Sequence, residues 1–161
     1  MQKSPIQQSH ILANKPLAAV LGQLPAPVFS GNSRSLGKCP NAGGVYLLAM
    51  ALPRRTKIMR PTETILPPGL YCYAGSAHGP GGLRARLARH LAKEKSIRWH
   101  VDQLTTRASS LHVWAWLEGT ECELATKMKQ NEGFSVPLPG FGSSDCPHCA
   151  SHLFANPADM R

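Results

Sequence analysis

The sequence predicts a small α+β domain in which a small antiparallel sheet is flanked by helices, and three patterns lead to that class. Apolar runs of strand length alternate with turn-forming residues between positions 45 and 75. Leu83, Leu87 and Leu91 then recur every four residues, which is the spacing of an amphipathic helix. Residues 110–117 return to a two-residue alternation, which is typical of a strand. A length of 161 residues fits one such domain.

The first forty residues are predicted to form a basic extension that is flexible or loosely docked. Five prolines interrupt this stretch, no acidic residue occurs in it, and its residues do not alternate as those of a strand would. We expect the ordered domain to cover residues 41–156, followed by a short tail at 157–161.

A three-stranded meander is expected next. The apolar run at 45–52 has strand length, residues 56–59 are expected to return antiparallel to it, and 70–75 forms a third strand rich in tyrosine. Prolines and glycines punctuate the chain between these runs. The three strands would make the core of the sheet, to which 110–117 can add an extra strand.

Helices are expected around this sheet. The leucine spacing predicts a helix over 82–94, and a shorter apolar period predicts another over 97–104. Thr120 and Glu123 have the spacing of a capping box, which predicts a helix from there to about Gly133. Residues 134–154 show no period and are expected to form an ordered loop.

The charge of the chain favours a polyanionic partner. Lys and Arg total 18 against 9 Asp and Glu, and no acidic residue precedes Glu63. A solvated basic surface is the alternative explanation. No apolar run reaches the ~18 residues of a membrane span, and 5 cysteines without framework spacing indicate reduced thiols. We therefore expect an intracellular (cytoplasmic) protein with no membrane contact.

Short motifs on these expected elements form an ordered series. Gly44-Val45-Tyr46 and Tyr73-Ala74-Gly75 lie on strands, and Leu83-Arg84-Ala85-Arg86 opens the helix that follows. The series resembles the GIY-YIG endonuclease superfamily, and in particular a small GIY-YIG-like subfamily. The strings that carry this second resemblance are Tyr73-Ala74-Gly75-Ser76-Ala77, Arg89-His90-Leu91, Arg98-Trp99-His100-Val101-Asp102, Gly142-Ser143-Ser144-Asp145-Cys146 and Ser151-His152-Leu153. Together the motifs span residues 43–154.

The resemblance implies a small antiparallel sheet with two tyrosines, a helix arginine and a glutamate around one divalent metal ion. It assigns the tyrosines to Tyr46 and Tyr73, the arginine to Arg86, and a further catalytic position to His90. The residue types suit phosphodiester hydrolysis, because an arginine fork matches phosphate oxygens. A tyrosine with its ordinary pKa is a poor base at neutral pH, so Tyr46 would need nearby cations, such as Arg86 and His90, or the metal to lower that pKa.

Glu123 matches the metal-binding glutamate, and the implied ion is Mg²⁺ or Mn²⁺. A single carboxylate is enough for Mg²⁺, which keeps most of its waters. The alternative is structural, because Glu123 in a capping box would reach back to the amide of Thr120. In that case Glu121 is the remaining candidate ligand. Ser76 stands where better-studied relatives often carry a lysine.

The implied function is metal-dependent endonuclease activity on DNA, with branched or damaged DNA in repair as the candidate substrates. The alternative is a catalytically silent module that binds nucleic acid. The DNA backbone is expected along the basic residues of 84–98 and its neighbour His100, namely Arg84, Arg89, Lys93, Arg98 and His100. Trp114 and Trp116 either stack on bases or pack under a helix.

The segment near the carboxyl terminus carries a possible metal motif. Cys146, Cys149 and His152 are spaced as crowded ligands of a zinc site. The alternative is that they only pin this loop beside the active face. Both interpretations stay open from the sequence.

Overall fold

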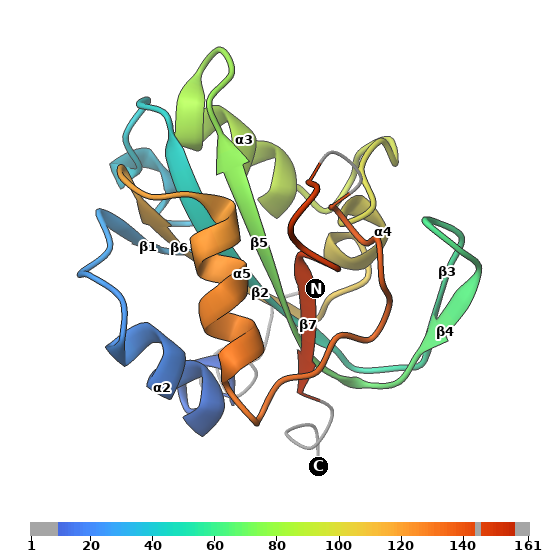
Figure 1. Ribbon diagram of the computed structural model, residues 1–161. Coiled ribbons are helices and arrows are strands. Elements are labelled where there is room, and N and C mark those ends of the chain that lie inside the picture. Colours follow the sequence, from blue (N-terminus) through green and yellow to red (C-terminus); the bar gives the residue numbers. More distant parts are fainter. Residues whose placement is uncertain (1–9, 144–145, 157–161) are drawn as a thin grey trace.

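The computed structural model describes residues 10–143 and 146–156 and confirms the α+β class (Figure 1). The elements in chain order are α2 (Lys15–Gly22), β1 (Phe29–Gly31), η1 (Leu36–Lys38), β2 (Gly44–Leu52), β3 (Thr56–Ile58), β4 (Thr64–Leu66), β5 (Gly69–Ala77), α3 (Gly82–Leu91), α4 (Asp102–Thr105), β6 (Ser110–Trp116), α5 (Glu121–Gln130) and β7 (Leu153–Asn156). None of the helices in the described ranges has the length and apolar character of a membrane span.

The main sheet is antiparallel with the strand order β1-β6-β2-β5-β7. Every residue of the central strand β2 is buried, and successive side chains enter two different apolar cores on the two faces of the sheet. Helices α3 and α4 contribute to the core that contains Tyr46, whereas α2 and α5 contribute to the core that contains Val45. Helices therefore cover both faces of β2, which explains its unbroken apolar run.

The expected meander is wrong in one respect. Strand β3 pairs with β4 in a separate two-stranded sheet, and β2 pairs directly with β5 on one side and β6 on the other. Both hydrogen-bonding edges of β2 are thereby occupied, so β3 has no place beside it. The β3–β4 hairpin stands apart from the main sheet (Figure 1).

The described part of the predicted extension is folded against the domain. Pro16 lies in the first turn of α2, where a missing N–H costs nothing, and the Asn14 side chain accepts a hydrogen bond from Leu17 N at 2.8 Å. Leu17 and Val20 are buried in the core that α5 shares, and β1 pairs with β6. Residues 1–9 and the expected tail at 157–161 lie outside the described residues.

The remaining elements follow the predictions with shifted ends. Helix α3 ends at Leu91, where Lys95 Nζ donates to the carbonyls of Arg89 and His90 at 2.8 Å each. Helix α4 and α5 are shorter than predicted, and the segment expected to be only loop ends in β7, which pairs with β5. Trp114 and Trp116 are each 6% exposed in the core with α5, so the packing alternative is the one observed.

Docking of α2 predicts a large effect of core truncation. Leu17→Ala should lower the free energy of unfolding by about 2–5 kcal/mol, because Leu17 is 1% exposed. Leu12→Ala is the matched control, since Leu12 is 54% exposed, and should change it by less than about 0.5 kcal/mol. Urea unfolding measures both. Equal, small effects would mean that the segment is not docked.

Candidate functional site

Three of the four predicted catalytic side chains line one pocket, and the fourth, His90, lies directly behind it. The pocket has a volume of about 380 Å³. Its lining residues are Tyr46, Tyr73, Ser76, Arg86, Glu121, Cys122, Gly142, Cys146, Pro147, His148 and His152. They come from β2, β5, α3, α5 and the segment before β7, so the pocket forms where the sheet meets helices from both of its sides.

Tyr46 and His90 form the polar centre behind this pocket. The Tyr46 hydroxyl and His90 Nε2 are 2.6 Å apart and share a hydrogen bond, and both residues are 1% exposed. The Tyr73 ring lies 6.4 Å from both the Tyr46 and the His90 ring centroids. His90 is therefore buried in the core and not exposed on the surface of α3.

Two glycines make room for the tyrosine rings. A Cβ on Gly75 would lie 2.4 Å from Tyr46 ring atoms, and Gly75 is the residue directly opposite Tyr46 in the β2–β5 pairing. A Cβ on Gly142 would lie 2.5 Å from the Tyr73 ring, and Gly142 has a φ of +67°. The pocket thus requires glycine at both positions.

Burial sets the protonation of these groups. It raises the pKa of Tyr46 well above its ordinary value and that of Tyr73 to about 12, although Arg86 acts in the opposite direction. Burial also lowers the pKa of His90 to about 3, with the Lys95 charge adding to it. Nearby cations alone therefore do not lower the pKa of Tyr46 as a role as base would require. Tyr46 is protonated and His90 is neutral at pH 7.

The structure separates the two candidate glutamates. Glu121 lines the pocket, and its charge raises the pKa of both Tyr46 and Tyr73. Glu123 lines a different pocket, and its backbone N–H donates to Thr120 Oγ1 at 3.1 Å in the predicted N-cap. Glu123 is therefore not placed with the tyrosines, because the helical phase turns it away from them.

Sequence reasoning gave no role to Asp102, which organises the rim behind Arg86. Its Oδ2 accepts from Arg89 Nη2 at 2.7 Å and from the amides of Arg98 and Trp99 at 2.9 Å each. Burial by itself raises the pKa of Asp102, but these donors outweigh it and hold that pKa below its usual value. The loop so fixed sets the Trp99 ring against two guanidinium groups, with Arg86 Cζ at 4.5 Å and Arg89 Cζ at 4.7 Å from the ring centroid.

Most of the predicted DNA-binding residues make structural contacts within the protein, and Arg98 is exposed. Arg84, Arg89 and Lys93 direct cationic groups at backbone carbonyls of neighbouring segments, so they brace the fold. His100 Nδ1 accepts from Gly142 N at 3.0 Å, which makes His100 a hydrogen-bonded support for the pocket wall. The basic face is less continuous than its sequence suggested.

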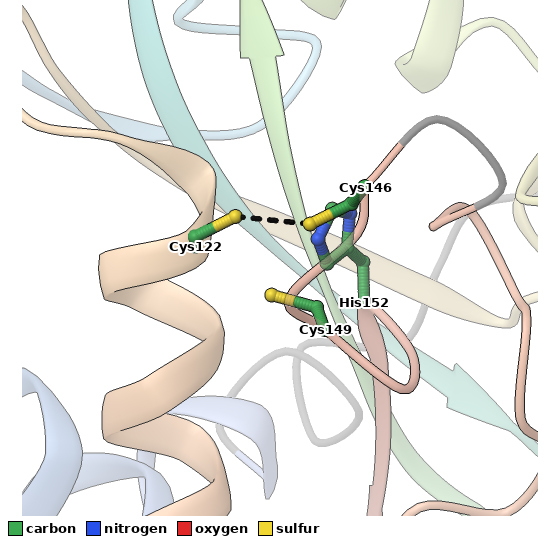
Figure 2. Close-up of side chains that lie close together, drawn as sticks. All are labelled: Cys122, Cys146, Cys149 and His152. Atoms are coloured by element: carbon green, nitrogen blue, oxygen red, sulfur yellow. Dashed lines mark hydrogen bonds between the residues drawn. The ribbon is translucent and has the colours of Figure 1, made fainter.

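A second constellation adjoins the pocket. Cys122, Cys146, Cys149 and His152 offer ligand atoms that all lie within 4.8 Å of one another, and together they could hold a metal ion (Figure 2). Cys122 belongs to the first turn of α5, and the other three belong to the segment that leads into β7. Sequence reasoning missed Cys122, because nothing in the spacing connects it with the later motif.

The thiols of this cluster interact with one another, and its imidazole has a buried nitrogen atom without a partner. The backbone amides of His148 and Cys149 and the Cys122 thiol lower the pKa of Cys146 to about 6, and the same thiol contact raises that of Cys122 to about 12. The two sulfurs are 3.3 Å apart. His152 is 2% exposed, and its Nε2 is buried without a hydrogen-bond partner. An unpaired buried nitrogen beside three thiols is what a metal ion would satisfy.

Comparison with known proteins gives a family but no activity. A family model described as "Domain of unknown function DUF123" matches residues 45–161. The match covers the pocket and the thiol cluster. No curated protein and no solved structure matches the chain.

The buried imidazole predicts a pH dependence of stability. The pKa of His90 is about 3 in the folded protein and ~6.5 in an unfolded chain. The contribution of neutral His90 to the free energy of unfolding is therefore complete above pH 6.5. It is lost as the pH falls toward 3, because the unfolded chain then binds a proton that the folded protein does not. His90→Gln should remove this loss, so that the drop in unfolding free energy between pH 7 and 5 shrinks by about 2 kcal/mol. Urea unfolding at the two pH values tests it, and an unchanged drop would contradict the burial of a neutral His90.

Proposed function

The chain belongs to the DUF123 domain family, whose description assigns no activity. We propose that the protein is a metal-dependent endonuclease that hydrolyses phosphodiester bonds of DNA. The observation that carries the proposal is the joint presence of Arg86, Glu121, Tyr46 and Tyr73 in one pocket. The ordered resemblance of the motifs to the GIY-YIG nucleases supports the same class.

Arg86 and Glu121 divide the work on the phosphate. Arg86 lines the pocket and stacks on Trp99 outside it, and its planar fork matches two phosphate oxygens. Glu121 provides a half-buried carboxylate for Mg²⁺ or Mn²⁺, which binds through one or two carboxylates plus substrate oxygens. When bound, such an ion stabilises developing negative charge and makes a water more acidic.

Tyr46 and His90 are suited to moving a proton. In the tautomer that carries its proton on Nδ1, His90 Nε2 accepts the hydrogen bond from the Tyr46 hydroxyl, so it can take that proton while the tyrosine oxygen accepts another from water. A neutral His90 is a weak base in the free protein. The negative charge of a bound phosphate opposes the effect of burial, because it favours the imidazolium. Proton transfer is thereby linked to the presence of substrate.

A nucleic-acid-binding module without catalysis is the second candidate. It is favoured by the depth of Tyr46, which is 1% exposed, and by the raised pKa values of both tyrosines. The formal charge of +9 supports nucleic acid as the partner in either case. The two candidates differ in whether purified protein cuts DNA.

We further propose that the ion of the thiol cluster is zinc. Three thiolates and one imidazole make a soft, four-ligand set, which is typical of structural zinc and unsuited to Mg²⁺. The two proposed ions thus differ in ligand chemistry. Oxygen ligands serve the pocket, and sulfur and nitrogen ligands serve the cluster.

A pair of isosteric variants tests the nuclease. Glu121→Gln should lower the rate of nicking of plasmid or branched DNA with Mg²⁺ by about a hundredfold or more, because it removes the metal carboxylate. Glu123→Gln removes the same charge from the same helix and should stay within a few fold of wild type. Salt-dependent DNA binding should persist in both. Equal loss in the two variants would contradict the assignment, and a wild type that cuts no duplex, flap, junction or single strand would favour the binding module.

Metal analysis tests the zinc. Purified wild type dialysed against a weak chelator should retain about one zinc per chain, as closed sites with four ligands do. His152→Ala should lower this content, because it removes the one nitrogen ligand. Elemental analysis by mass spectrometry gives the stoichiometry. If wild type holds another metal at full occupancy, or holds no metal, the assignment of zinc to the thiol cluster is wrong.

A further inference from the structure

We infer that the metal centre builds one wall of the DNA pocket, by tethering a short knuckle, residues 146–149, to the first turn of α5, and that the knuckle presents His148 to the substrate. The consequence for DNA rests on the proposed nuclease, whereas the tether rests on the proposed zinc ion alone.

The cluster and the pocket share side chains. Cys122, Cys146 and His152 belong to the candidate ligand set and also line the pocket. Glu121 directly precedes Cys122, so an ion that fixes the sulfur also fixes the first turn that carries the carboxylate. The position of Glu121 relative to the tyrosines therefore depends on how α5 is held.

The knuckle also contributes to the pocket. Pro147 and His148 lie between the two cysteines of the knuckle, and both line the pocket. His148 is exposed and is not a member of the ligand set. A neutral imidazole can donate an N–H to a phosphate oxygen. The position of His148 at the pocket therefore depends on Cys146 and Cys149, the candidate metal ligands on either side of it.

The knuckle, residues 146–149, and the chain on either side of it are held by different interactions. Backbone hydrogen bonds join the chain before the knuckle to the chain after it: His152 N donates to Phe141 O at 2.9 Å, and Gly140 N donates to Ala150 O at 2.6 Å. Between the described residues of the knuckle itself and α5, the polar contacts are hydrogen bonds between thiols, from Cys122 to Cys146 and Cys149 (Figure 2). Thiol contacts are weak, so an ion bonded to all three sulfurs would be the main polar link across this wall.

Hydrogen exchange of the full-length protein tests the tether without reference to activity. Cys122→Ser should lose zinc and raise exchange at amides of residues 146–152 by about tenfold or more, while the central strand β2 stays protected. Cys122→His offers a replacement ligand and should restore both zinc and protection. Zinc loss with unchanged exchange at the knuckle would overturn the tether, as would full zinc retention in Cys122→Ser. Chelation and re-addition of zinc to wild type repeats the comparison without any substitution.

A second variant tests the role of His148. His148→Gln should keep zinc content and exchange at wild-type values, but weaken DNA binding by about fivefold, as loss of one phosphate contact would. Unchanged affinity would overturn that part of the inference. If wild type neither binds nor cuts DNA, the proposed function fails, while the exchange data still decide the tether.

Discussion

The constraint on which the site depends is the register of β2 against β5, which places Tyr46 opposite Gly75. Because Gly75 has no side chain, the Tyr46 ring occupies the space where one would stand and reaches His90 on α3. A slip of one residue would turn Tyr46 to the other face of the sheet. The hydrogen bond of 2.6 Å between tyrosine and histidine therefore follows from a backbone pairing rather than from flexible side chains.

Local patterns predicted the parts of the site that neighbouring elements supply. Tyr46 and Tyr73 lie on adjacent strands and Arg86 and His90 lie one helical turn apart, so the motif order was enough to bring them together. The same patterns failed where burial was decided by distant contacts. Prolines indicate breaks in regular structure, but Pro16 at the start of α2 favours a helix, and the core that α2 shares with α5 and the sheet stabilises it.

Helical phase and sequence distance explain the errors at α5. The capping box located the start of the helix, yet it could not tell which of two glutamates faces the tyrosines, because they lie two residues apart and about 200° around the helix. Cys122 was missed for another reason. It lies 24 positions before Cys146, and sequence spacing carries no information on how α5 packs against the strand that follows.

The two proposed ion sites follow from one turn of α5. Consecutive residues point in directions about 100° apart, so Glu121 directs an oxygen to the pocket, while Cys122 lies where a sulfur can serve both the pocket wall and the thiol cluster. Hard ions prefer the oxygen ligands and zinc prefers the thiolates. Ligand chemistry can therefore keep the two ions apart even though their sites share a wall. A wall held by the proposed zinc ion would suit the proposed nuclease, because a phosphate could then bind beside Tyr46 without rearrangement of the sheet.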